Sequence, residues 1–515
     1  MTAKWVRAGV MVAAAAAALA MAPPAPVQQR PVVASLAIGE EPAVITRHRI
    51  ETETKVLQYT AEAGRIAIRD VETGEPHGYI FYIAYRVPSG GKPRPVTFVW
   101  NGGPGSSSAL LHFYVAGPKR AEGGHLVDNR ETWLAGTDLV FVDPVGTGFG
   151  RPAKPEYAAE FYGTLGDAAS VTEFVRCWLL LHDAQDAPLF LVGESYGGPR
   201  AAAVSYALEK RGIRVNGAVL ISGGAGLNTD YCPPSLREAL YVADLSATAL
   251  FYGKTSPALG KDRDTVRREA EAWGRQTYAP ALANAAQLSE GERAAVIAQL
   301  SGFTGLPADR LDAKTLVVTP REFATGLLKD ERRTLQTFDM RKSVATGSVP
   351  AVEEIGTKGA ILRYLRDDLG YRVDLPYLDQ GLGSLEEGFA PSGTYPQSTN
   401  ARWNYATAPI SPEAYKAIIA EASKRGGGPP RYGPPLPAIE EAIAIDPRIK
   451  VMVASGIYDL TTACTVDREI ARHLPPKLER AITFKCYAGG HMMYRNPPIR
   501  LQLTRDVMAL IAASR

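Results

Sequence analysis

Four short apolar runs, each bounded by turn residues, constrain the fold more than any other feature of this chain. They are Val96–Trp100, Leu139–Val142, Leu189–Val192 and Val215–Ile221. Helical patterns near 166–183 and 196–211 separate the last three runs. Wholly apolar strands that alternate with helices are typical of a parallel sheet buried on both faces. The pattern therefore predicts a doubly wound α/β domain, preceded over residues 49–88 by antiparallel strands.

The alternation of strands and helices is interrupted once. It stops after Gly226 and resumes at 450–454, followed by a strand near 481–487 and a C-terminal helix near 498–513. The segment between has mostly helical pattern and long polar loops. We therefore predict an α/β core made of residues 46–229 and 446–515, with a large, mainly helical insertion over 230–445.

The N-terminal residues have the pattern of an export signal. Lys4 and Arg7 precede an alanine-rich apolar run, and residues 18–20 (Ala-Leu-Ala) resemble a cleavage site. The run is about 15 residues long, whereas a spanning helix needs roughly 20. We expect a cleaved signal peptide over 1–20, a proline-rich linker over 21–45, no stable membrane anchor after cleavage, and a secreted or periplasmic protein. Cleavage removes two positive charges and lowers the net charge from +3 to +1, which gives no support to a nucleic-acid partner.

One turn has the pattern of a nucleophile site. Gly193-Glu194-Ser195-Tyr196-Gly197 follows a buried strand and precedes an alanine-rich helix. A G-x-S-x-G sequence at such a turn is typical of the nucleophile elbow of α/β-hydrolases, in which the serine hydroxyl is lifted above the sheet. The backbone N–H of Tyr196 can then face a developing oxyanion. A plain glycine-rich turn is the alternative interpretation.

A second glycine-rich turn, residues 100–108 (WNGGPGSSS), follows the first apolar run. In α/β-hydrolases the corresponding loop supplies a second N–H to the oxyanion. A plain β-turn is the alternative. A phosphate-binding loop does not fit, because no G-x-x-x-x-G-K-[ST] sequence is present.

Chain order selects the base and the acid. In this fold the order is serine, acid, histidine, and only His473 and His491 follow Ser195. His473 lies in a helical pattern, where we expect a solvated or capping residue, whereas His491 directly follows the last strand. Asp459 follows the preceding strand, but Asp446 precedes it and Asp467 is expected to be a first-turn or surface acid. We therefore predict Ser195, Asp459 and His491 as nucleophile, orienting acid and base.

These motifs resemble those of the serine carboxypeptidases, peptidase family S10, in the form of a secreted bacterial member. The resemblance rests on WNGGPGSSS (100–108), DPVGTGFG (143–150), GESYGG (193–198), YDLTT (458–462) and GGHM (489–492). It implies an α/β-hydrolase fold, a cap over 230–445, and a peptide or protein substrate with a free C-terminus. It also implies that Asn101, Gly102 and Glu194 bind the substrate carboxylate and that Gly103 and Tyr196 form the oxyanion hole. A carboxylate beside Glu194 requires one shared proton, which implies activity favouring acidic pH.

The chain departs from the family pattern at three places. Ser106 replaces a cysteine in the first motif, and residues 493–498 (MYRNPP) replace the usual sequence after His491. The third departure is the small set of four cysteines, of which Cys464 and Cys486 flank the predicted acid and base. A disulfide between them and two small buried thiols are equal alternatives.

The sequence contains no recognisable cofactor or metal motif. Neither H-E-x-x-H nor C-x-x-C occurs, so we predict neither a metal site nor an organic cofactor. An esterase or acyltransferase of the same fold, and a non-catalytic peptide-binding relative, are the alternative functions. Monomer and homodimer both stay open.

Overall fold

The computed structural model describes residues 41–91, 93–223, 231–348, 355–379, 399–408, 410–424, 432–433, 436 and 438–514. The predicted signal peptide and most of the predicted linker lie outside the described residues. Strand β1 begins at Val44, so the fold starts within the end of the predicted linker. Among the helices described, none is both long and apolar enough to cross a membrane.

A 10-stranded sheet forms the centre of the fold, in the order β1-β2-β3-β7-β4-β9-β10-β13-β14 with β8 paired to β3. Neighbouring strands from β1 to β7 are antiparallel, and those from β7 to β14 are parallel. The antiparallel part comprises β1 (Val44–Glu51), β2 (Val56–Arg69), β3 (Pro76–Arg86) and β8 (Arg151–Pro152). The parallel part comprises β7 (Asp138–Asp143), β4 (Val96–Trp100), β9 (Leu189–Glu194), β10 (Gly217–Ile221), β13 (Lys450–Gly456) and β14 (Ile482–Tyr487). The predicted mostly parallel α/β fold is confirmed.

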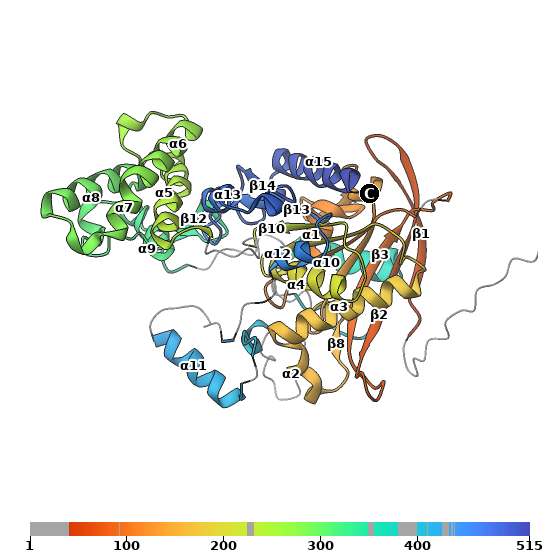
Figure 1. The fold of residues 1–515 in the computed structure, drawn as a ribbon. Helices are drawn as coiled ribbons and strands as arrows, with labels where there is room; N and C mark the ends of the chain where they lie inside the picture. The colour runs from red at the N-terminus through yellow and green to blue at the C-terminus, as the bar shows by residue number, and fades with distance from the viewer. Residues whose placement is uncertain are drawn as a thin grey trace, which may run out of the picture. The chain divides into compact units, whose positions relative to one another are not determined.

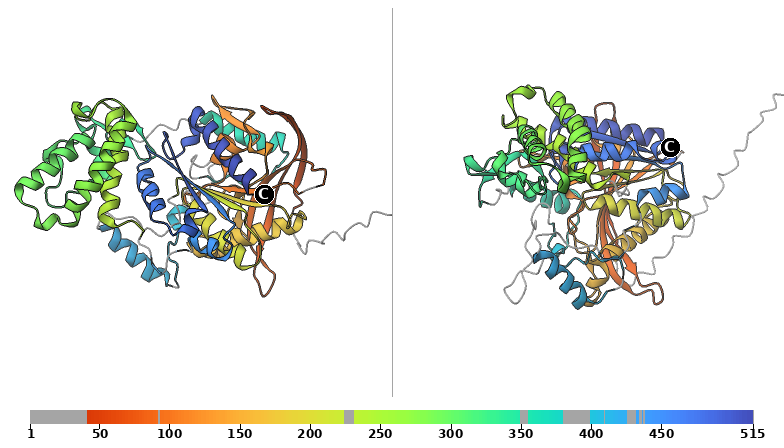
Figure 2. Two further views of the ribbon diagram at one scale, coloured as in Figure 1. Left: turned by 45° about the horizontal axis from the view of Figure 1, so that its top comes forward. Right: turned by 60° about the vertical axis from the view of Figure 1, so that its left-hand side comes forward.

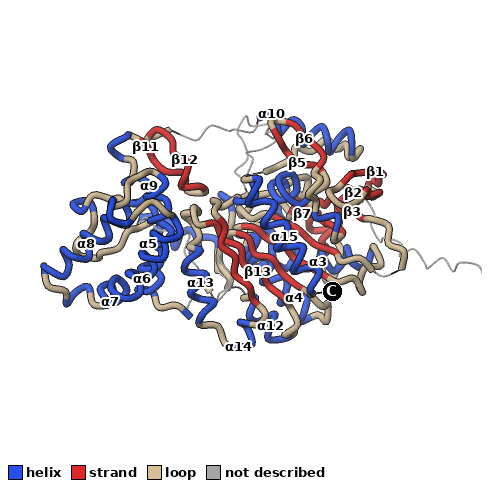
Figure 3. Tube along the Cα trace, turned by 90° about the horizontal axis from the view of Figure 1, so that it is seen from above, coloured by secondary structure: helices blue, strands red, loops and turns tan. Residues whose placement is uncertain are grey.

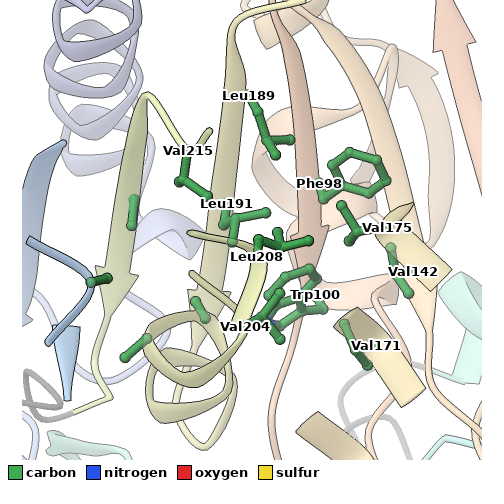
Figure 4. Packing of buried hydrophobic residues seen from close by; sticks show 14 of the residues in the cluster. Phe98, Trp100, Val142, Val171, Val175, Leu189, Leu191, Val204, Leu208 and Val215 are labelled. Atoms are coloured by element: carbon green, nitrogen blue, oxygen red, sulfur yellow. The ribbon is translucent and has the colours of Figure 1, made fainter. Parts of the chain in front are cut away.

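The inner parallel strands β7, β4, β9 and β10 are buried on both faces, which explains why their sequences are largely apolar. On one face Phe98, Trp100 and Leu191 pack against α3 (Thr164–Leu181) and α4 (Gly197–Lys210) (Figure 4). On the other face Val99 and Val192 belong to the core that includes α15 (Pro497–Ala513). Figure 3 shows the strands in red with helices on both sides. Shorter elements near the sheet are α1 (Ala109–Leu111), β5 (Lys119–Glu122), β6 (His125–Asp128), α2 (Ala158–Phe161), α13 (Cys464–Arg472) and α14 (Pro476–Glu479).

The first part of the predicted insertion forms a separate helical core. It contains Leu245, Trp273, Leu300, Phe323 and Met340, all buried. The elements are α5 (Pro234–Phe251), α6 (Arg263–Trp273), α7 (Ala279–Ala283), α8 (Glu290–Thr304), α9 (Pro320–Gly326) and the hairpin of β11 (Arg333–Gln336) and β12 (Asp339–Ala345). These helices form one group in Figures 1 and 2. We call residues 234–345 the helical cap.

Described residues later in the predicted insertion pack with the main fold rather than with the helical cap. Ile361 of α10 (Ile355–Arg363), together with Tyr364 and Leu365, is buried in the same core as Phe81 and Phe113. Buried residues of α12 (Ile439–Ile445) join the opposite face of the sheet. The sequence pattern did not separate these helices from the cap, because apolar periodicity shows that a helix is buried but not which core it joins. The remaining helix is α11 (Pro412–Lys424).

Candidate active site

Ser195 occupies a strained turn between β9 and α4. Its φ of 55° lies in the left-handed region, which residues other than glycine rarely adopt and which is concentrated at functional sites. The Ser195 N–H donates to the carbonyl of Ile221 at 2.8 Å and so ties the turn to the end of β10. A Cβ on Gly193 would collide with the Gly197 backbone, so glycine is required there. This geometry is that of the predicted nucleophile elbow.

Asp459 and His491 lie in the loops after β13 and β14 and form a buried pair. His491 Nδ1 is 2.7 Å from Asp459 Oδ2, and the two residues are 6% and 0% exposed. Because a carboxylate can only accept, the neutral His491 ring has its hydrogen on Nδ1. Its Nε2 can therefore accept a proton. Thr461 donates its N–H and its hydroxyl to Asp459 Oδ1, and the Thr462 hydroxyl donates to Oδ2, all at 2.7–2.8 Å. Burial lowers the pKa of His491, but the hydrogen bond and charge of Asp459 outweigh burial and raise it overall.

Ser222, at the end of β10, connects the serine turn to the histidine loop. Its hydroxyl donates to the His491 carbonyl at 2.7 Å, and its N–H donates to Ala454 of β13 at 2.8 Å. Gly223, which follows, packs on the carbonyl of Ser195. The loops that contain Ser195, Asp459 and His491 therefore meet at the carboxyl edge of the parallel strands, where ligands bind in open α/β sheets.

The second glycine-rich turn packs directly on the serine turn. Trp100 Nε1 donates to the Gly197 carbonyl at 2.9 Å. A Cβ on Gly102 would collide with the backbone of Glu194 and Tyr196, and Gly103 has a φ of 99°. Both glycines are therefore required by the backbone, the first for close approach and the second for its positive φ. The backbones of the two predicted oxyanion-hole residues, Gly103 and Tyr196, belong to turns in direct contact.

Glu194 and Asn101 form a buried polar pair next to the serine. Asn101 Nδ2 donates to Glu194 Oε2, and the two residues are 1% and 2% exposed, respectively. Tyr494 donates its hydroxyl proton to Glu194 Oε1 at 2.8 Å. Burial raises the pKa of Glu194 above that of an ordinary glutamate, despite these hydrogen bonds. Our sequence reasoning did not single out Tyr494, although it lies in the segment that departs from the family pattern.

The histidine and the two acids that strand placement set aside, His473, Asp446 and Asp467, lie outside the Asp459–His491 pair. His473 follows α13 and contacts Glu469 at 2.9 Å, and Asp446 precedes β13 and pairs with Arg448 at 2.7 Å. Asp467 lies in the first turn of α13, as one alternative predicted, but the other alternative, a surface acid, is wrong. It is buried, accepts from the Ser455 hydroxyl at 2.5 Å, and has its pKa raised by burial to about 7.

A disulfide braces the two loops that carry the acid and the base. Cys464 at the start of α13 and Cys486 in β14 are bonded, with Cα atoms 5.8 Å apart. Of the two alternatives open from the sequence, the structure has the bridge. Ser106, at the position of the family's cysteine, is buried in the second glycine-rich turn.

The tip of the β11–β12 hairpin of the helical cap contacts the histidine loop. The His491 N–H donates to the Phe338 carbonyl at 2.6 Å, and the two rings lie 4.8 Å apart. The Leu460 N–H donates to Thr337 at 3.0 Å on the same tip. The Phe338 residue is 50% exposed. This contact was not predicted from the sequence, because the hairpin itself was not predicted.

No group of three or more His, Cys, Asp and Glu side chains is placed to hold a metal ion in the described part of the chain. This edge of the sheet brings together the serine, the histidine–aspartate pair and the buried Glu194–Asn101 pair. This set can perform acyl transfer through a serine ester.

Residues 55–220 match the model of the serine carboxypeptidase family, Peptidase_S10. The chain is similar to serine carboxypeptidases. It is 32% identical over 151 residues to the pheromone-processing carboxypeptidase KEX1 of Arthroderma otae, an alignment that covers 27% of this chain and 23% of that protein. It is 32% identical over 151 residues to serine carboxypeptidase-like 14 of Arabidopsis thaliana, covering 28% of this chain and 33% of that protein. The alignments thus span a third or less of these relatives, and the family match ends before Asp459 and His491.

A solved structure extends the likeness of the fold to most of the chain. The Kex1 prohormone-processing carboxypeptidase of Saccharomyces cerevisiae superposes with a TM-score of 0.51 at 15% identity, covering 89% of this chain and 91% of that one. At this identity the superposition establishes the fold. The protein has the α/β-hydrolase fold.

Proposed function

We propose that this protein is a serine carboxypeptidase of family S10 that removes C-terminal residues from peptides through an acyl-enzyme on Ser195. The observation that carries the proposal is the buried Asn101–Glu194 pair, in which Glu194 directly precedes Ser195. A serine hydrolase of any kind needs the elbow and the histidine–aspartate pair. A pair that recognises a terminal carboxylate beside the serine is needed only by an enzyme that cuts at the chain end.

In the proposed mechanism Ser195 attacks the last peptide bond while His491 Nε2 accepts the hydroxyl proton. The negative charge that develops on the carbonyl oxygen is stabilised by the backbone N–H groups of Gly103 and Tyr196. His491, held by Asp459 through Nδ1, then gives its proton to the leaving amine. Water hydrolyses the resulting ester by the same proton path in reverse, and Ser195 is regenerated.

The substrate carboxylate is proposed to bind to Asn101, the Gly102 N–H and Glu194. A buried, raised-pKa Glu194 supports this role, because a neutral carboxyl can donate a hydrogen bond to a carboxylate whereas an ionised one repels it. Activity is therefore proposed to favour acidic pH. Export to the periplasm or the medium is proposed from residues 1–20 alone, and N-terminal sequencing of the protein purified from its host tests it.

A matched pair of peptides tests the proposed activity. One carries a free C-terminus and the other an amide, and mass spectrometry follows the release of single residues. We expect stepwise release at a much higher rate from the free acid than from the amide, blocked by a serine-directed phosphonate and by Ser195→Ala. Ser205→Ala is the control, because Ser205 is a buried serine of α4 whose hydroxyl donates within the same helix, at 2.7 Å to the Ala201 carbonyl. Equal cleavage of the amide would refute carboxylate recognition, and full activity of Ser195→Ala would refute the nucleophile.

A further inference from the structure

Tyr494 contacts Glu194 although the two residues are 300 positions apart in the sequence, and Tyr494 follows the loop of His491. It is in the 3-10 turn Met493–Arg495 that leads into α15, and it is fully buried in the core beneath the sheet edge. Its hydroxyl donates to Glu194 Oε1 at 2.8 Å. Its hydroxyl contacts the oxygen of Glu194 that does not accept from Asn101, so its effect on a substrate acts through Glu194.

The orientation of Asn101 determines which group it presents to Glu194. Asn101 Oδ1 accepts from the Leu111 N–H at 3.0 Å, so its amide nitrogen is the group that faces Glu194 Oε2. The Asn101 carbonyl in turn accepts from Arg200 at 2.8 Å. Both oxygens of Glu194 are therefore held, Oε2 by Asn101 and Oε1 by Tyr494, which fixes the plane of the carboxyl group.

We propose that Tyr494 is a positioning residue that prepares Glu194 for the substrate carboxylate, an inference that rests on the proposed function. Tyr494 and Asn101 each donate to one oxygen of Glu194, so together they fix the plane of the carboxyl group. A protonated Glu194 held in this plane can donate to a substrate carboxylate beside the Asn101 amide. Without the Tyr494 hydroxyl, Oε1 becomes a buried acceptor with no donor, and the carboxyl group is held at one oxygen only.

Tyr494→Phe tests this role because it removes the hydroxyl and keeps the ring in the core. For a free-acid peptide we expect KM to rise about tenfold, with kcat changed less than about twofold, as for loss of one hydrogen bond to a binding group. For the amidated peptide or a simple ester we expect no change. The ratio of kcat/KM for free acid to that for amide therefore falls about tenfold.

Tyr487→Phe is the matched control. Tyr487 is also a buried tyrosine that donates to a carboxylate, Asp506, at 2.7 Å, but its partner is in α15 rather than in the site. Both variants lose one hydroxyl–carboxylate hydrogen bond, which is part-buried at Asp506 and buried at Glu194, so we expect a decrease in melting temperature for each. Only Tyr494→Phe is expected to change the free-acid preference.

The possible outcomes separate this inference from the proposed function. If the wild-type protein prefers the free acid and Tyr494→Phe keeps that preference, the Tyr494 proposal is wrong and the carboxylate site stands. If the wild-type protein does not prefer the free acid, both fail. Loss of the preference in Tyr487→Phe as well would show a general loss of packing and would also overturn the proposal. In a Glu194→Gln background, removal of the Tyr494 hydroxyl is expected to have no further effect on the ratio, and an additional tenfold loss there would contradict action through Glu194.

Discussion

Glu194→Gln is expected to abolish the fall in activity on free-acid peptides as the pH rises toward neutral. Burial raises the pKa of Glu194, so its carboxyl group stays protonated to a higher pH than an exposed glutamate. Above that pKa the group ionises and loses the proton that it donates to the substrate carboxylate. The wild-type kcat/KM then falls about tenfold for each pH unit, as for any single required proton. Glutamine is neutral at every pH and has no proton to lose.

The size of the effect follows from the distance at which a carboxylate must bind. Two like charges about 4 Å apart in surroundings with an effective dielectric constant of about 20 repel by about 4 kcal/mol, close to a thousandfold in binding. The glutamine fits the existing partners. Because the Asn101 amide is fixed by Leu111, the glutamine carbonyl faces Asn101 and its NH₂ group faces the hydroxyl of Tyr494, which can accept.

The assay is kcat/KM against pH, from about pH 4 to pH 8, where glutamate and histidine titrate. It compares one peptide as free acid and as amide, in wild type and Glu194→Gln. We expect the alkaline fall only for the wild type on the free acid. The acid limb belongs to His491, which must be neutral to accept the Ser195 proton, and it persists in the variant.

An unchanged alkaline limb in Glu194→Gln would refute the reasoning, since no titrating group would then remain at position 194. An alkaline limb of equal size on the amidated peptide would refute it independently, because that substrate has no carboxylate to repel. A lower activity of the variant without an alkaline limb is compatible with the mechanism, since glutamine donates a weaker hydrogen bond than a carboxylic acid.

Three further predictions concern the base, a buried acid and the disulfide. Asp459→Asn is expected to lower kcat by about 10⁴-fold with little change in KM, because the asparagine favours the wrong histidine tautomer; steady-state kinetics measure this. Asp467 has its pKa raised from 3.8 to about 7, so the folded protein binds this proton more tightly and the free energy of unfolding falls as the pH rises from 3.8 to about 7. Asp467→Asn should remove that fall, up to about 4 kcal/mol, in urea unfolding at both pH values, and an unchanged slope would contradict the burial argument. Replacing Cys464 and Cys486 by serine opens a bridge between residues 22 apart in sequence and should cost about 3 kcal/mol, seen as a lower urea midpoint.

Much of the site could be predicted because each of its main residues directly follows a strand that the sequence reveals. Ser195, Asp459 and His491 come after runs whose apolar pattern is local, and the carboxyl ends of parallel strands meet at one edge. The pattern needed no knowledge of side-chain contacts. For the same reason the pattern showed that Asp446 precedes its strand and is at the wrong end for the catalytic acid, and the structure places it before β13.

The sequence by itself therefore determined where the parallel strands end and which residues follow them. Only the tertiary structure decided which helices of the 230–445 segment join the main core, that Asp467 is buried, and that Tyr494 meets Glu194 across 300 residues of sequence. Periodicity records that a side chain is apolar or that a helix has a buried face. Which distant partner covers it depends on how the elements pack, and this packing fixes the burial and hydrogen bonds that set the pKa of Glu194.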